Sequence, residues 1–109
     1  MVGKLFQVIF SLKSRTRLKE ISEYHKENVS KEVSKKVRQK IVAEASKLKE
    51  LPESKPILPG TENMDYEVRY TKAWSFKIIF RVFNPKNIVR ILTIRHDKEA
   101  PEDILKDID

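Results

Sequence analysis

The sequence predicts one α+β domain, in which a hairpin of two helices packs on one face of a curved antiparallel sheet. Three observations lead to this prediction. After a short apolar N-terminal stretch, apolar residues recur every three or four positions in the first half of the chain. In the second half they alternate with polar residues, and a proline-rich stretch separates the two halves. The 109 residues suit a single domain, residues 1–109, and 39% of them are hydrophobic, which is enough for one core.

The N-terminal half is expected to hold one strand and two helices. Residues 4–10 are mainly β-branched, aromatic and aliphatic, which predicts a strand largely covered on both faces. Ser11 or Ser14 can cap a helix that ends at Asn28, and Ser30 can cap a second helix, over 30–52. Helical spacing places these apolar residues on one stripe of the second helix: Val33, Val37, Ile41, Ala45 and Leu48. Such a pair of helices forms an antiparallel hairpin that must cover an apolar surface.

The C-terminal half is expected to supply that surface. Three of the five prolines fall in residues 52–64, which predicts an irregular loop. Alternating patterns then predict a three-stranded antiparallel meander, to which the N-terminal strand adds, with strands over 66–71, 76–83 and 88–94. Pro101 begins a short terminal helix, whose apolar residues are Ile104, Leu105 and Ile108.

The composition excludes several kinds of site. There is no cysteine, so disulfide scaffolds, thiolate metal sites and cysteine nucleophiles are excluded, and two histidines cannot form a multi-histidine zinc centre. Two glycines cannot build a glycine-rich phosphate loop. We therefore expect neither a metal nor a cofactor. Apolar runs of two or three residues and the lack of a signal-peptide pattern predict a cytoplasmic protein without membrane contact.

The charge is unevenly placed along the chain. Residues 1–96 carry 21 Lys and Arg against 10 Asp and Glu, whereas residues 97–109 carry 2 against 6. A basic body with an acidic tail predicts a polyanionic or acidic partner. An ordinary solvated surface is the alternative interpretation.

One face of the predicted sheet is where chemistry could occur. If the apolar positions of strand 76–83 face the helices, Lys77 and Arg81 face the opposite, open side. Strand pairing can bring Arg69 to the same side, and His96 ends the last strand. Cations around an imidazole are what metal-free cleavage of RNA requires, since a base, an acid and fixed positive charge must act on one phosphate.

Two other interpretations of this face stay open. With Trp74 in the adjacent turn and Lys98 just after the last strand, the same cations, including Arg81, describe a binding surface for a polyanion or an acidic partner. The face could equally be structural, covered by the terminal helix or by a partner. An indole in such a turn is more often a packing lid than a stacking platform.

The strand sequences resemble the RelE/ParE toxin superfamily. The runs YEVRY (66–70), FKIIFRV (76–82) and ILTIRH (91–96) are similar to its arginine strand, its YRIIYRV strand and its ILxIxH strand. The resemblance covers nearly the whole chain. It implies the toxin of a type II toxin–antitoxin pair, whose partner is a small antitoxin encoded beside it. An acidic, partly disordered antitoxin segment would complement the basic body.

The resemblance implies two kinds of target. ParE-like members poison DNA gyrase, whereas RelE-like members are ribonucleases that cut mRNA on the ribosome. Carried over by position, the nuclease residues would be Arg69, Lys77 and His96, with Lys98 in the basic position after the histidine. Lys77 stands where arginine is common, and residues 99–109 contain no tyrosine or histidine, which favours the ParE-like alternative. A non-toxic member that only binds its antitoxin is the third alternative.

Overall fold

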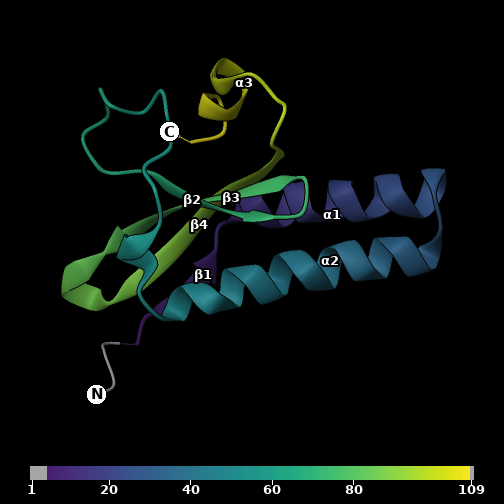
Figure 1. The fold of residues 1–109 in the computed structure, drawn as a ribbon, viewed down its shortest axis with the longest axis horizontal. Coiled ribbons are helices and arrows are strands. Elements are labelled where there is room, and N and C mark those ends of the chain that lie inside the picture. Colours follow the sequence, from purple (N-terminus) through teal and green to yellow (C-terminus); the bar gives the residue numbers. More distant parts are fainter. Residues whose placement is uncertain (1–4, 109) are drawn as a thin grey trace.

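The computed structural model describes residues 5–108 and has the expected element order, β-α-α-β-β-β-α. The elements are β1 (Gln7–Phe10), α1 (Leu12–Asn28), α2 (Lys31–Ser46), β2 (Arg69–Ala73), β3 (Phe76–Phe83), β4 (Ile88–His96) and α3 (Pro101–Leu105). The two long helices lie on one side of the sheet, and α3 lies on the other (Figure 1). Residue 4, where the predicted first strand begins, lies outside the described residues. No helix within 5–108 is long and apolar enough to cross a bilayer.

The sheet is mixed, and the expectation of a fully antiparallel sheet is wrong for one pair. The strand order is β1-β4-β3-β2, with β1 parallel to β4 and the other pairs antiparallel. The hairpin explains this, because it returns the chain to the end where β1 begins: Leu5 bridges Glu50, and the Phe6 amide donates to the Lys49 carbonyl at 2.9 Å. The meander that follows therefore starts in the same direction as β1, and its third strand has that direction again.

Serine caps fix where the helices begin. The Ser11 hydroxyl accepts from the Ser14 amide at 3.1 Å and donates to the Leu92 carbonyl at 3.0 Å, so it joins the start of α1 to β4. Ser30 caps α2 in the same way, accepting from the Val33 amide at 3.1 Å. The Ser30 cap was predicted, and for α1 the structure selects Ser11 from the two predicted alternatives, Ser11 and Ser14.

The second helix is shorter than predicted. It ends at Ser46 instead of reaching Pro52, and a 3-10 turn over Lys47–Lys49 follows. The tighter turn directs Leu48 into the core, where it is fully buried. After the turn the chain is extended, and Glu50 forms a β-bridge with Leu5. Leu51 then adopts a left-handed conformation, with φ of 49°, at the corner before Pro52.

Two cores lie on opposite faces of the sheet. One is on the face covered by α1 and α2, the helix-side face, and the other is on the face covered by the C-terminal segment 97–108, the tail-side face. The helix-side face carries Phe76, Ile78 and Phe80, which pack with Ile41 and Leu48. On the tail-side face, Ile79 packs with the residues that cover it, which come from the loop before β2, from β4 and from the C-terminal segment: Leu58, Val68, Leu92, Ile104 and Ile108. The face expected to be open is therefore partly covered by the chain itself.

The strand boundaries differ from the prediction on the tail side. β2 begins at Arg69 instead of Tyr66, because the preceding residues bond the loop: the Leu58 amide donates to the Val68 carbonyl at 2.7 Å. The 52–64 loop also contains one 3-10 turn, Pro52–Ser54. β4 is two residues longer than predicted and contains a bulge opposite Ile79 and Phe80. Because of this bulge, Leu92 and Thr93 both face the tail side.

Replacing Ser11 tests whether its hydroxyl joins α1 to the sheet. Ser11→Ala removes the cap of α1 and leaves the buried Leu92 carbonyl without its donor, so the free energy of unfolding should fall by about 2 kcal/mol. Urea denaturation measures this change. The control is Ser46→Ala, an exposed position, for which about 0.5 kcal/mol or less is expected. Equal effects for the two variants would contradict the assignment.

Candidate functional site

The strand register separates the four basic residues that the sequence placed together. Arg69 pairs with Phe80, and His96 pairs with Phe76, so both occupy the helix-side face. Lys77 and Arg81 alternate with these core positions and lie on the tail-side face. The expectation of one cluster is therefore wrong. The sequence did not specify the register, and a shift of one residue reverses the face of every side chain.

On the helix-side face, the two histidines flank Phe76. Ring centroids are 5.6 Å apart for Phe76 and His96 and 6.0 Å apart for His25 and Phe76. With Tyr24 and Trp74 these rings line a pocket of about 650 Å³. The sequence prediction did not include His25 in a site; its helical spacing from Leu18 and Ile21 was the signal for this position. No group of three or more metal-ligating side chains occurs in residues 5–108.

Trp74 is the most unusual residue of this pocket. It lies in the turn between β2 and β3 as expected, has a left-handed φ of 53°, and is 56% exposed. A bulky residue in this region of φ is strained, and such strain is concentrated at functional sites. At this exposure the indole does not act as the packing lid considered from the sequence, and its surface is open to contact.

Arg69 is used to hold the loop before β2. Its guanidinium donates to the Lys55 carbonyl at 2.6 Å and pairs with Glu67 at 2.9 Å, and the side chain is only 16% exposed. Lys98, by contrast, is exposed, and its backbone amide donates to His96 Nδ1 at 3.1 Å. The Arg69 guanidinium is therefore engaged away from the His96 imidazole, and the contact of Lys98 with that imidazole comes from its backbone and not from its ammonium group.

On the tail-side face, the cations lie on aromatic rings. The Lys77 ammonium is 5.2 Å from the Tyr70 ring centroid. The Arg81 guanidinium carbon lies 3.8 Å from the centroid of Tyr66 and 4.1 Å from that of Phe83. Cation–π contacts hold these charged groups in fixed orientations.

Asp107 attaches the acidic tail to the rest of the chain. Its carboxylate accepts from Arg17 at 2.8 Å, Arg95 at 2.7 Å and Thr93 at 2.9 Å, and only 4% of the side chain is exposed. Burial acts to raise the pKa of Asp107, but the hydrogen bonds from Arg17, Arg95 and Thr93 outweigh it and hold the pKa well below its usual value. The pKa of Arg17 is raised, chiefly by its hydrogen bond to Asp107.

Further acidic residues of the tail are also paired. Glu99 binds Arg95 and accepts from the His96 amide at 2.8 Å, and the hydrogen bond from Arg95 lowers the Glu99 pKa. Asp97 pairs with Lys72 at 3.0 Å, which lowers the Asp97 pKa. The negative tail thus neutralises part of the basic body within one chain.

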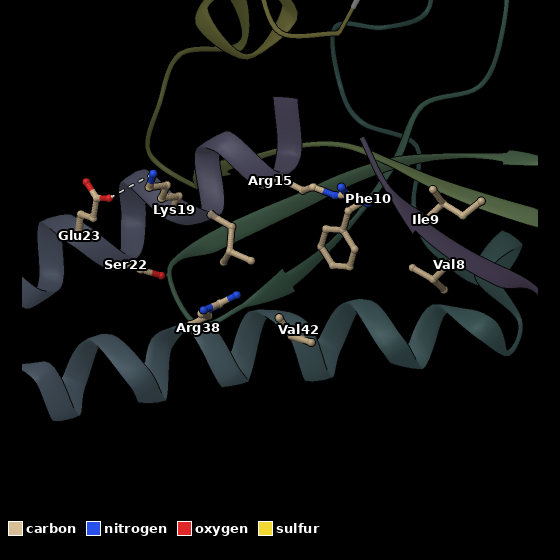
Figure 2. A pocket seen from close by; sticks show the side chains of 10 residues that line it. Val8, Ile9, Phe10, Arg15, Lys19, Ser22, Glu23, Arg38 and Val42 are labelled. Carbon is tan, nitrogen blue, oxygen red and sulfur yellow. Dashed lines mark ion pairs between the residues drawn. The ribbon is translucent and has the colours of Figure 1, made fainter. Parts of the chain in front are cut away.

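A groove of about 760 Å³ lies between the N-terminal elements (Figure 2). Val8 and Phe10 extend from β1 toward α2, and Val42 extends from α2 toward them. Three cations border these apolar groups: Arg15, Lys19 and Arg38. Glu23 faces Lys19 at 3.9 Å. β1 is an edge strand, so its outer side is available for pairing. The sequence prediction missed this groove, because it treated the first strand as covered on both faces.

Solved structures share this fold. No protein-family model and no curated protein matches the chain. A chain of the chromosomal ParDE TA system from P. aeruginosa is 20% identical with a TM-score of 0.69, over 86% of this chain and 98% of that one. The RelBE2 toxin–antitoxin complex from Mycobacterium tuberculosis is 17% identical, with a TM-score of 0.63, over 91% and 97%. The free toxin RelE of E. coli, in mutant form, is 14% identical, with a TM-score of 0.60, over 94% of each chain. The chain has the RelE/ParE-like fold.

Removing the Asp107 carboxylate should destabilise the protein in a pH-dependent manner. Asp107→Asn leaves Arg95 and Arg17 without their shared anion, at a cost of about 3 kcal/mol at pH 7. Because the folded pKa is lowered, the stabilisation is complete above the unfolded pKa of about 3.9 and is lost as the pH falls through the folded pKa. Urea denaturation should therefore show a smaller difference between the variant and the natural protein at pH 3 than at pH 7.

The matched control for this test is Asp103→Asn, which removes an exposed carboxylate from the same tail. Its effect should stay within about 0.5 kcal/mol at both pH values. An Asp107 effect of the same size at pH 3 and pH 7 would refute the ionic role of the carboxylate.

Proposed function

We propose that this chain, which has the fold of the RelE and ParE toxins, is the growth-inhibiting toxin of a toxin–antitoxin module. We further propose that it acts by binding a protein target, DNA gyrase, as ParE-like toxins do, and that it does not cut RNA. The observation that carries this choice is the location of His96 on the face of the sheet opposite Lys77 and Arg81.

Cleavage of RNA requires a base and fixed cations within hydrogen-bond reach of one phosphate. His96 packs against Phe76 on the helix-side face, and the arginine next to it in sequence and the arginine on the same face are both engaged elsewhere. Arg95 is paired with Glu99 and Asp107, and Arg69 is bonded to Lys55 and Glu67. This arrangement favours a binding protein over a nuclease that uses Arg69, Lys77 and His96.

The pocket around Trp74 suits contact with a protein target. Trp and Tyr are the residue types that dominate the binding energy of protein interfaces. Trp74 and Tyr24 are both more than half exposed, and they lie at the rim of one pocket. We assign the target-binding surface to these two residues together with His25, Phe76 and His96.

The groove between α1, α2 and β1 suits the antitoxin. Its apolar lining can receive the apolar side of a helix or strand, and its border of Arg15, Lys19 and Arg38 complements acidic side chains. A small acidic antitoxin encoded beside this chain has that chemistry. Since the groove and the Trp74 pocket have no lining residue in common, the antitoxin and the target would use separate surfaces.

Two assays on the purified protein test the proposed activity. We expect inhibition of DNA gyrase supercoiling, whereas mRNA in a reconstituted translation reaction, followed by primer extension, should stay intact. Induced expression of the chain alone should stop growth. Discrete cuts in the ribosomal A site would refute the gyrase assignment in favour of a nuclease. A folded protein that is inactive in both assays and does not stop growth would refute the toxin role itself.

Charge reversal in the groove tests antitoxin binding. Arg15→Glu combined with Arg38→Glu should weaken binding to the acidic partner encoded beside this chain at least tenfold, because like charges then face each other. Isothermal titration calorimetry gives the affinity. The control is Lys31→Glu combined with Lys35→Glu, which makes the same charge change at exposed positions of α2 outside the groove. If both double variants lost the same affinity for the partner, binding would depend on net charge alone and the groove would not be the antitoxin site.

A further inference from the structure

A smaller pocket, of about 330 Å³, lies on the tail-side face next to the start of α1. It shares no residue with the groove or with the Trp74 pocket. Its polar side is formed by cations from three elements, Lys13 of α1, Arg81 of β3 and Arg90 of β4. Its apolar side includes Tyr66 and Phe83.

Arg81 is held in place by aromatic rings and not by a carboxylate. Its guanidinium is sandwiched between the rings of Tyr66 and Phe83, at 3.8 and 4.1 Å from their centroids. Two stacked rings fix the plane of the guanidinium, so little conformational entropy is left to lose when a ligand binds its edge.

The Arg81 guanidinium also lacks an acceptor. Its Nε is buried and has no hydrogen-bond partner in residues 5–108, where buried donors are nearly always satisfied. Within the same residues, none of the ion pairs involves Arg81, Arg90 or Lys13. Three cations that border one pocket are therefore uncompensated by the described part of the chain.

The first turn of α1 adds to the positive potential. Lys13 belongs to this turn, which contains no acidic residue, and the amides of Leu12 and Lys13 precede the first intrahelical bond, donated by Arg15 to Ser11. Such amides carry the positive end of the helix dipole. Leu12 and Lys13 both line the pocket.

The one carboxylate that lines the pocket does not compensate these cations. Asp107 already accepts hydrogen bonds from Arg17, Arg95 and Thr93. Its contacts show how this face of the molecule binds an oxyanion: a carboxylate occupies the neighbouring position between two arginines. The pocket beside Arg81 has cationic donors as well, like those around Asp107, but no carboxylate of residues 5–108 forms an ion pair with them.

We propose that this pocket is a binding site for a phosphate group, held by the edge of the Arg81 guanidinium and by Arg90 and Lys13. Phosphate is favoured over a carboxylate because three cations border the pocket, and a phosphate group carries up to two negative charges and at least three acceptor oxygens, whereas a carboxylate carries one charge and two oxygens. The site is independent of the proposed gyrase-binding surface, and its test does not require toxin activity.

Titration with inorganic phosphate, followed by NMR, tests the site directly. The Nε–H signal of Arg81 and the backbone amide signals of Leu12 and Lys13 should shift together and saturate with one dissociation constant. Arg90→Gln should weaken this binding at least tenfold; Arg90 is exposed, so the loss should not come from unfolding. Arg81→Lys keeps the charge but loses the planar stacking and the edge donors of the guanidinium, and it should also weaken binding. Lys35→Gln, an exposed charge change on α2, is the control and should leave the affinity unchanged.

Two further ligands identify the source of the phosphate, and acetate tests the preference for phosphate over a carboxylate. A nucleoside monophosphate that binds more tightly than inorganic phosphate would assign the site to phosphate monoesters, and a dinucleotide that does so would assign it to the backbone of a nucleic acid. Acetate should bind at least tenfold more weakly than phosphate. Equal binding of acetate, no saturable shift of the Arg81 signal, or equal loss in Lys35→Gln would each overturn the proposal.

Discussion

The buried carboxylate of Asp107 connects parts of the chain that would otherwise separate. It is bonded to Arg17 of α1, 90 residues away, and to Thr93 and Arg95 of β4. Through it the C-terminal segment is fixed where Ile104 and Ile108 can close the second core over Ile79. A buried charge is tolerated here because Arg17, Thr93 and Arg95 all donate hydrogen bonds to it. The tail is therefore a structural part of the domain, and its negative charge is internal compensation for the basic sheet.

The alternation of side chains along the strands separates the two surfaces of the molecule. Phe76 and His96 form one cross-strand pair on the helix-side face, whereas Lys77 and Arg81 lie on the other face. Residues adjacent in sequence are thereby assigned to different environments, one aromatic and one cationic. A sheet of this kind can present two independent binding surfaces without any change in its backbone.

Local rules predict much of this fold, and long-range pairing accounts for what they miss. The limits of β3, the caps Ser11 and Ser30 and the start of α3 at Pro101 follow from alternation, capping and proline geometry. The parallel direction of β1 depends on where the hairpin returns the chain, which no local pattern encodes. The face occupied by Arg69 and His96 depends on register, and the partners of Asp107 depend on contacts across the whole sequence. The predicted cluster of four basic residues was wrong for this reason, although each of these residues was correctly predicted to lie on or beside a strand.

The single tryptophan of the chain stands in the exposed turn between β2 and β3 instead of the core. More than half of this residue is exposed in the folded protein, so unfolding should shift its fluorescence emission less than it would for a buried tryptophan. A partner that covers the pocket beside it would move that emission to shorter wavelength. Trp74 is thus a natural optical reporter of whether this pocket is occupied.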